Sequence, residues 1–335
     1  MSFKPYLQLY RSRQLFALTA IAALLKPFYR IAFLAGARES GLLEILSGKP
    51  MRLEQLAAGY CRDAKAREAL AAWLELGVRL GQLQIGADGY ALKGLAKKLA
   101  EPGNDAAMAM VEEVARLHYK LIADTPAKLR RGELWSMSDQ DGELIARSSR
   151  ILEAFQIEAI DRCFPVAGPV RLLEVGCGSG AYIRHAAIKN PTLTALGLEL
   201  QPDVAEVARG NIAAWGLSER VRIEAGDIRS RTPDELFDVV TLYNNIYYFP
   251  VGERVALLRH LRSFVKPGGM LLATTCCHGG SVGVDVLNLW GAATVGCGPL
   301  PRVDEFVQQL REAGFAEAEA IHLSPGESFY AFKSR

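Results

Sequence analysis

The chain has 335 residues, of which half are hydrophobic and 23% are charged, and its formal net charge at pH 7 is +2. These values describe an ordinary soluble protein with a sizeable core and room for two domains. The small net charge favours no particular charged partner, and no long basic run suggests a tail that binds nucleic acid.

The cysteines give no sign of a metal site. None forms a C-x-x-C pair, and their spacings do not resemble a set of zinc ligands. A chain of this size does not need disulfides, so a reducing compartment is the simpler interpretation, and we expect a cytoplasmic protein without a metal ion. The six residues are Cys61, Cys163, Cys177, Cys276, Cys277 and Cys297.

The N-terminal segment combines basic residues with an apolar run. Lys4, Arg11 and Arg13 precede Leu15–Leu25, an arrangement that resembles the core of a signal peptide. No small-x-small cleavage site follows before Pro27, and the run is shorter than the roughly 20 apolar residues that span a bilayer. We therefore expect no membrane insertion. The alternative to export is a buried helix that pairs with another helix, for instance one from a second subunit.

The first hundred residues are predicted to be mainly helical and to end in a β-hairpin. Pro27 is expected to end or kink the first helix. Leu83 and Ile85 alternate with polar residues, and Asp88-Gly89 is a typical hairpin turn. The expected helices cover residues 7–26, Tyr29–Leu46, Leu53–Tyr60 and Ala64–Leu76.

Helices followed by a two-stranded wing form a winged helix, which often reads DNA. A DNA-reading helix usually carries several basic or amide side chains toward the base edges. The helix at Ala64–Leu76 is mostly alanine and leucine, with Lys65 and Arg67 at its start. Burial against a partner therefore fits this helix better than a DNA groove.

Residues 105–164 are predicted to be mostly helical, and these helices could cover a ligand site as a lid. From residue 170 the pattern changes to alternating strands and helices, which is typical of an α/β sheet. The last two strands are joined by the short turn Ser324-Pro325-Gly326-Glu327, so the final strand should be antiparallel to its neighbour. We expect strands at 170–175, 194–199, 220–224, 237–243, 269–276, 315–322 and 327–333, and helices at 180–190, 202–215, 251–265 and 302–313.

The stretch Arg171–Ala181, RLLEVGCGSGA, organises this half of the chain. A short buried strand runs into a loop in which Gly176, Gly178 and Gly180 alternate, and a helix begins at about Ala181. Glycines let the backbone turn sharply near a ligand, and the first turn of the helix offers free N–H groups to an anion. Such units bind adenosine-type cofactors in doubly wound sheets, although the loop alone also fits the loose dinucleotide pattern.

The carboxyl ends of the predicted strands carry further polar side chains, and open α/β sheets bind ligands at that edge. Glu174 lies beside the glycine loop, and Glu199 ends the next strand, about where a ribose-binding acid is expected. Asp227 follows the third strand, and Tyr243–Phe249 follows the fourth. Each residue alone could be a helix cap or a turn residue, but together they indicate one cofactor site.

These features resemble a class I S-adenosylmethionine-dependent methyltransferase. The likeness rests on LEVGCGSG, on Glu199, on GDI at 226–228 and on Lys266-Pro267-Gly268-Gly269 before an apolar strand, and it covers residues 170–335. The N-terminal half is similar to the winged-helix dimerisation domain of small-molecule O-methyltransferases through IAFLAGARESGLLEIL and GVRLGQLQIGADGYALKGLAKKLA.

The resemblance implies an α/β, Rossmann-like, seven-stranded methyltransferase sheet with an antiparallel last strand, and an N-terminal, mainly α, winged-helix dimerisation domain. The implied domains are a dimerisation domain at 1–104, a helical linker or lid at 105–165 and an S-adenosylmethionine-binding domain at 166–335. The family also implies a homodimer with interlocked N-terminal helices, and a small-molecule substrate rather than nucleic acid.

The resemblance gives a role to each residue of the cofactor site. The glycines lie against the methionine part, Glu174 orients the groups around its ammonium, and Glu199 binds the ribose hydroxyls. Asp227 holds the adenine, and the carbonyl of Asn244 borders the methyl group. The implied cofactor-binding residues are Glu174, Gly176, Gly178, Gly180, Glu199, Leu200, Asp227, Ile228 and Asn244.

The sequence departs from plant-type family members at the general base. Those enzymes place a His followed by Asp after the fourth strand, whereas YNNIYYF stands here, and asparagine accepts no proton at neutral pH. Methyl transfer from a sulfonium needs a base only when the acceptor is weakly acidic, so an amine, an acidic phenol, a thiol or an enolised carbon would suit. The candidate catalytic residues are Asn245, Tyr247, Tyr248 and His278, with His118-Tyr119 further away.

The sequence gives weaker signals for other ligands and functions. Cys276-Cys277-His278 is not expected to hold a metal, because adjacent strand residues point to opposite faces. The aromatic residues, which include Trp135 and Trp290, fit a planar or apolar substrate and fit a protein core equally well. Two other functions stay open: a DNA-binding regulator whose sheet domain senses a ligand, and an NAD-dependent oxidoreductase. The weakly basic helix counts against the first, and the terminal hairpin and Asp227 count against the second.

Overall fold

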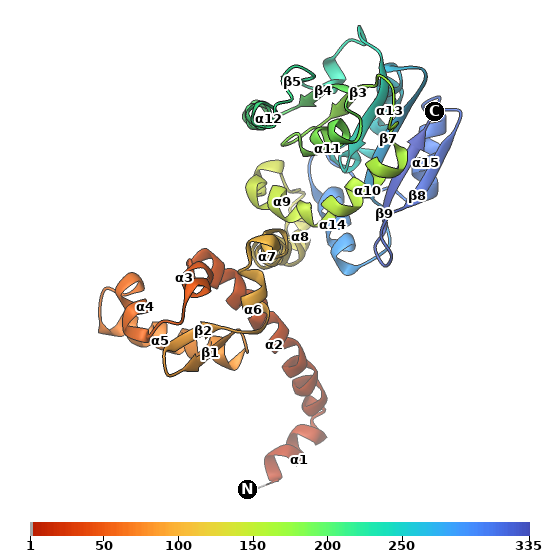
Figure 1. Cartoon of the computed structure of the whole chain (residues 1–335). Helices are drawn as coiled ribbons and strands as arrows, with labels where there is room; N and C mark the ends of the chain where they lie inside the picture. Colours follow the sequence, from red (N-terminus) through yellow and green to blue (C-terminus); the bar gives the residue numbers. More distant parts are fainter. Residues whose placement is uncertain (1–2) are drawn as a thin grey trace. The chain divides into compact units, whose positions relative to one another are not determined.

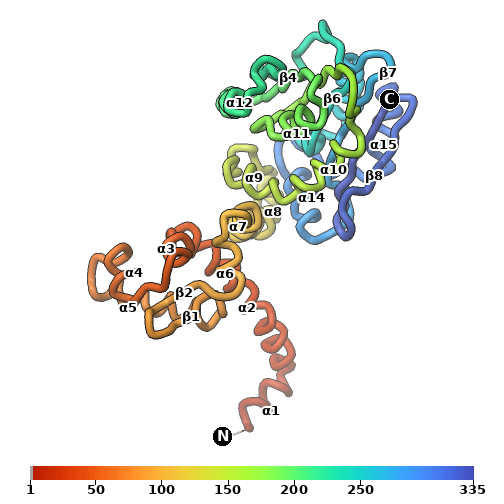
Figure 2. The backbone as a smooth tube through the Cα atoms, viewed as in Figure 1, coloured from red at the N-terminus to blue at the C-terminus, as the bar shows by residue number. Residues whose placement is uncertain are grey.

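The computed structural model describes residues 3–335, and the chain forms two compact units. The first unit contains the residues up to Ala123 and Gln140–Ile151, and the second contains Asp124–Asp139 and Leu152–Arg335. Figures 1 and 2 show the helices of the first unit and the sheet of the second. The predicted division into three parts, with a separate segment at 105–165, stays a prediction.

The first unit is mainly helical, as expected. A tight hairpin of β1 and β2 pairs Leu83 with Leu92 and Gly86 with Gly89. Its elements are α1 (Lys4–Arg11), α2 (Gln14–Glu39), α3 (Leu42–Gly48), α4 (Leu53–Tyr60), α5 (Ala64–Arg79), β1 (Leu83–Gly86), β2 (Gly89–Leu92), α6 (Gly94–Leu99), α7 (Asp105–Glu113), a π-helical turn (Val114–His118) and α9 (Gly142–Ser149). Helix α8 (Tyr119–Arg130) begins in this unit and ends in the second.

The two helices predicted on either side of Pro27 form one helix, so the prediction that Pro27 ends a helix was wrong, and a kink at Pro27 stays a prediction. Helix α2 continues through Pro27 to Glu39. The break lies at Gly41, whose φ of +76° suits glycine and stops the helix. A single proline removes one backbone hydrogen bond, and the alanine and leucine residues around it favour the helix strongly enough to continue it.

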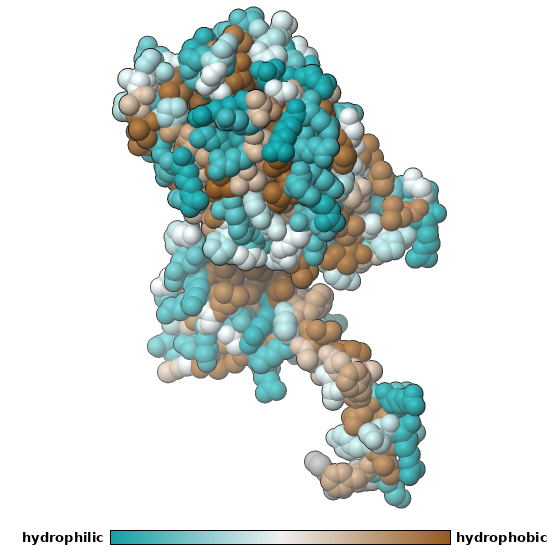
Figure 3. All heavy atoms as spheres, turned by 90° about the vertical axis from the view of Figure 1, so that its right-hand side faces the viewer, coloured by the Kyte–Doolittle hydropathy of each residue, from teal (hydrophilic) through white to brown (hydrophobic). Residues whose placement is uncertain are grey.

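Two apolar regions of the first unit differ in burial. The hairpin and helices α3 to α7 enclose a core that contains Phe33, Leu42, Leu74 and Leu83. Helix α2 before Phe33 is different, since Phe16 is 83% and Leu24 is 71% exposed. In Figure 3 brown and tan atoms lie at the surface along the N-terminal helical arm, interspersed with white and teal ones. Among the described residues, α2 is the one helix long and apolar enough to cross a membrane, a test that signal sequences also pass.

The second unit is built on a seven-stranded sheet with the order β5-β4-β3-β6-β7-β9-β8, which confirms the expected α/β architecture. The strands β3 to β7 are parallel to one another, and β9 is antiparallel to both β7 and β8. The elements are α10 (Glu153–Cys163), β3 (Arg171–Val175), α11 (Ala181–Lys189), β4 (Thr194–Glu199), α12 (Pro202–Ala214), β5 (Val221–Ala225), β6 (Phe237–Tyr243), α13 (Val251–Arg262), β7 (Val265–Cys276), α14 (Val282–Ala293), α15 (Val303–Glu312), β8 (Ala318–His322) and β9 (Phe329–Ser334). Helix α14 was not predicted.

The two faces of this sheet differ in chemistry. Helices α13 and α15 cover one face and form the main apolar core with residues such as Leu173, Val240 and Leu271. Side chains alternate along a strand, so Glu174 and Thr274 lie on the opposite face, which α10 and α11 cover (Figure 1). The polar side chains of the sheet thus lie on the α10–α11 face.

Candidate functional site

The glycine loop between β3 and α11 has the backbone that its sequence predicts. Gly176, Gly178 and Gly180 have φ values of +69°, +52° and +80°, which other residues rarely adopt. A Cβ on Gly178 would meet no atom within 4 Å, whereas one on Gly176 would lie 2.3 Å from Nδ2 of Asn245. The loop therefore opens to free space at Gly178 and packs closely at Gly176.

Glu199 is hydrogen-bonded to the glycine loop. The Oε2 atom of Glu199 accepts a hydrogen bond of 2.9 Å from the backbone N–H of Gly178, and Oε1 accepts one of 3.2 Å from Gln201. The N–H of Gly176 donates to the carbonyl of Leu198 at 2.7 Å. The end of β4 thus holds the loop after β3, and Glu199 lies at the carboxyl edge where a ribose-binding acid belongs.

Glu174 is an ionisable group without a partner. It is 2% exposed, and its Oε2 atom has no hydrogen-bond partner. Burial raises the pKa of Glu174 well above its usual value. A buried acceptor of this kind costs free energy unless a donor reaches it. The ammonium group of an amino acid next to the glycine loop would supply that donor, so the residues fit the methionine part of S-adenosylmethionine.

The residues predicted to hold the adenine follow β4 and β5. Leu200 is exposed, and Ile228 is buried beneath the loop after β5. Both carboxylate oxygens of Asp227 accept hydrogen bonds from Arg229, the shortest of them 2.7 Å, and this contact lowers the pKa of Asp227. Asp227 is therefore ionised and fixed in orientation.

The two asparagines after β6 have different surroundings. Asn244 has a φ of +55°, a left-handed conformation in which asparagine is one of the few tolerated residues, and its Oδ1 atom is buried without a partner. Its N–H donates to the carbonyl of Thr274 at 2.7 Å. The Nδ2 group of Asn245 donates to the carbonyl of Val175 at 3.0 Å, so this side chain lies over the glycine loop.

Three aromatic rings gather after these asparagines. Tyr247 and Tyr248 lie 4.9 Å apart between ring centroids, and Trp290 of α14 meets both edge to face, at 6.1 Å and 5.6 Å. The buried Arg254 of α13 donates to the carbonyls of Phe249, at 3.1 Å, and Pro299, at 2.6 Å. Burial lowers the pKa of Arg254 to about 10. Arg254 thereby fastens the loop after β6 to the loop after α14.

Two histidines are further candidates from the sequence. His278 is exposed, and its backbone N–H donates to the carbonyl of Pro301. His118 belongs to the first unit, where its Nε2 lies 2.9 Å from Oε1 of Glu113. Within residues 3–335 there is no cluster of three His, Cys, Asp or Glu side chains that could hold a metal.

The sequence prediction missed Gln156 and Arg254. Gln156 of α10 is 2% exposed and shares the buried stripe of that helix with Ala159, Ile160 and Cys163. A glutamine on an otherwise apolar helix face could have indicated a buried polar group with a function. Arg254 gave no such signal, because its two acceptors belong to loops whose positions the sequence does not reveal.

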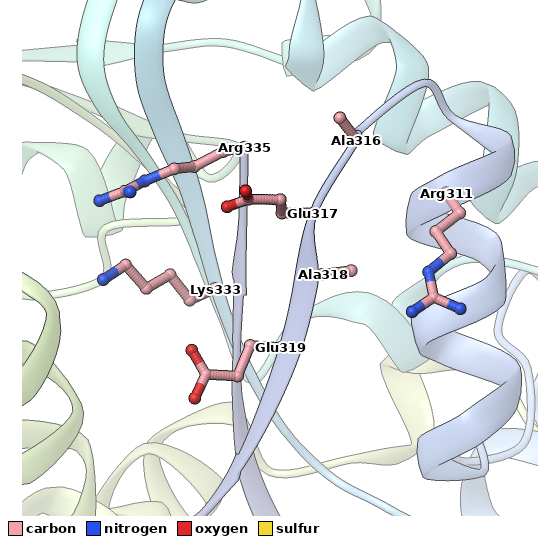
Figure 4. Close-up of a pocket in the computed structure, with 7 residues that line it drawn as sticks. All are labelled: Arg311, Ala316, Glu317, Ala318, Glu319, Lys333 and Arg335. Atoms are coloured by element: carbon pink, nitrogen blue, oxygen red, sulfur yellow. The ribbon is translucent and has the colours of Figure 1, made fainter.

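A surface hollow elsewhere is separate from this site. It lies on α15, β8 and β9, at the far end of the strand order from β4 and β5. Glu317 and Glu319 point to the same side of the hairpin as Lys333 and Arg335 (Figure 4). These charged side chains lie on and beside the terminal hairpin of β8 and β9, and they belong to no part of the cofactor site.

Comparison with known proteins identifies the type of domain that contains these residues. A family model described as a methyltransferase domain matches residues 173–271. The chain is 25% identical over 323 residues to demethylspheroidene O-methyltransferase of Rhodobacter capsulatus, which covers 89% of this chain and 77% of that protein.

Two solved structures share the fold. Mitomycin 7-O-methyltransferase MmcR has a TM-score of 0.81 at 20% identity, covering 97% of this chain and 99% of that one. Human N-acetylserotonin methyltransferase in complex with SAM has a TM-score of 0.70 at 19% identity, covering 95% and 97%. The matched domain contains the glycine loop, Glu174 and Glu199. The chain is a class I S-adenosylmethionine-dependent methyltransferase, and S-adenosylmethionine is its cofactor.

Proposed function

We propose that this enzyme methylates a small, planar or apolar molecule on an oxygen, nitrogen or carbon atom, without a histidine base at the end of β6. The observation that carries the proposal is the group of three aromatic rings in which Tyr247 and Tyr248, shortly after the two asparagines, meet Trp290 of α14. The methyl group of the cofactor belongs at this strand end, so an acceptor next to it would meet aromatic rings. The small-molecule acceptors named for the relatives agree with this assignment.

The methyl acceptor is expected to be nucleophilic without activation by a base of the protein. Neither Asn244 nor Asn245 can take a proton, and the side chain of Asn245 is held by the backbone of Val175. The protein's contribution is to hold the acceptor in line with the methyl–sulfur bond, at about 3 Å, and to exclude water.

A series of phenols with graded acidity tests this proposal. The rate of methyl transfer should follow the fraction of phenolate, and amines or thiols in the panel should react when deprotonated. Fast transfer to a weakly acidic phenol, with a pH profile that changes in His278→Gln, would instead identify His278 as a base. Mass spectrometry of treated lysate metabolites, searched for the gain of one methyl group, would find the natural acceptor.

We also propose that the enzyme is a cytoplasmic homodimer. The apolar side chains of α2 between Phe16 and Phe28 are exposed in a single chain, and a second copy of the same helix would cover them. This proposal agrees with the family resemblance of the N-terminal helices and needs no membrane.

A further inference from the structure

Four buried polar atoms without hydrogen-bond partners among the described residues belong to the carboxyl edge of the sheet and its α10–α11 face. They are Nε2 of Gln156, Oε2 of Glu174, the hydroxyl of Tyr243 and Oδ1 of Asn244. Most buried polar groups in proteins have a hydrogen-bond partner, so four unpartnered groups in one region call for an explanation. The Gln156 group is a donor, the Glu174 and Asn244 oxygens are acceptors, and the Tyr243 hydroxyl can act as either.

The orientation of the Gln156 amide is fixed by Thr274. The hydroxyl of Thr274 donates to Oε1 of Gln156 at 2.5 Å, so Nε2 is the group of this amide that is left without a partner. The backbone carbonyl of the same Thr274 accepts from the N–H of Asn244 at 2.7 Å. Thr274 thus links α10 directly to the left-handed residue at the end of β6, and Gln156 belongs to the same edge as Asn244.

This pattern of free groups matches an amino-acid zwitterion. A carboxylate would accept from Nε2 of Gln156, and an ammonium would donate to Glu174 and Asn244. The methionine part of S-adenosylmethionine carries both groups, and the glycine loop already places it at this edge. We propose that Gln156 binds the carboxylate of the cofactor's methionine part, and that the side chain of Asn244 joins Glu174 in accepting from its ammonium.

Two ligands that differ only in the amino-acid part separate this role from a structural one. S-adenosylhomocysteine carries the zwitterion, and 5′-methylthioadenosine lacks it. Isothermal titration of Gln156→Leu should show about 10- to 100-fold weaker binding of the first ligand, the range for a lost hydrogen bond to a charged group. Binding of the second ligand should change less than about twofold. Gln156→Glu, which sets a carboxylate against a carboxylate, should weaken S-adenosylhomocysteine further.

Gln309 offers a matched control. Its Oε1 atom is also buried without a partner, but it lies on α15, across the sheet. Gln309→Leu should leave the affinity of both ligands unchanged, and far-ultraviolet circular dichroism checks the fold of all variants. Equal losses for both ligands in Gln156→Leu, or no loss for S-adenosylhomocysteine, would overturn the proposal.

If Gln156→Leu does not fold, the unaltered protein still gives an answer. The decarboxylated analogue of S-adenosylhomocysteine keeps the amine, and it should bind about 10- to 100-fold more weakly than the parent. Equal binding would show that no residue grips the carboxylate. These measurements need no methyl acceptor, so they stand apart from the proposed acceptor class.

Discussion

Replacement of Gly176 by alanine should destabilise the methyltransferase domain through two separate costs. The φ of +69° costs an L-residue about 1–2 kcal/mol. The new methyl group would lie 2.3 Å from Nδ2 of Asn245, so that side chain must move and lose its hydrogen bond to Val175, at about 0.5–1.5 kcal/mol. We expect a total of about 1.5–3.5 kcal/mol, or roughly 3–14 °C in the thermal midpoint of the domain.

Gly178→Ala isolates the backbone cost, because its Cβ would meet no atom within 4 Å. It should lose only about 1–2 kcal/mol of stability, yet it should weaken S-adenosylhomocysteine, since the methyl group enters the open side of the loop. Differential scanning calorimetry and titration give both numbers. In an Asn245→Ala background the extra cost of Gly176→Ala should disappear. If the two glycine variants lose the same stability, or the extra cost persists without Asn245, the packing of Asn245 on the loop is wrong.

Three further outcomes are expected. Glu199→Ala should weaken S-adenosylhomocysteine by about 1–3 kcal/mol in titration, because the loop loses its anchor at Gly178 and the ribose loses an acceptor. Burial raises the pKa of Glu174, so binding of an ammonium next to it should displace a proton. The affinity for S-adenosylhomocysteine should therefore rise as pH rises above 4.5, and calorimetry should detect release of a proton. Glu174→Gln should remove this dependence of affinity on pH. Leu24→Lys should yield monomers in sedimentation velocity at concentrations where the wild type and Val207→Lys, a control on exposed α12, stay dimeric.

The cofactor half was readable from sequence because parallel strands bring their carboxyl ends to one edge. Glu174 and Glu199 close successive predicted strands, so their position beside the glycine loop followed from topology alone. The bounds of β4 and α4 matched the prediction residue for residue. Those segments carry strong periodicity and clear stop signals.

The parts that were missed depend on contacts between distant segments. Pro27 lies within a helix that the residues around it stabilise. The sequence alone did not show that their helix propensity outweighs the cost of the proline. Arg254 donates hydrogen bonds to the carbonyls of Phe249 and Pro299, and only the folded chain brings these two carbonyls together. Helix α14 was overlooked, although its Trp290 completes the aromatic group at the site.

The two asparagines explain why a base is missing at this strand end. A residue at position 244 must adopt a left-handed backbone, and the one at 245 must reach across to Val175 and cover Gly176. Asparagine suits both positions. At position 244 it tolerates the left-handed backbone, and at position 245 its amide donates the hydrogen bond to Val175. A protonatable side chain at position 245 could not both donate to the glycine loop and accept a proton from the methyl acceptor. We therefore propose that this strand end shapes the cofactor loop and that methyl transfer depends on the acidity of the acceptor.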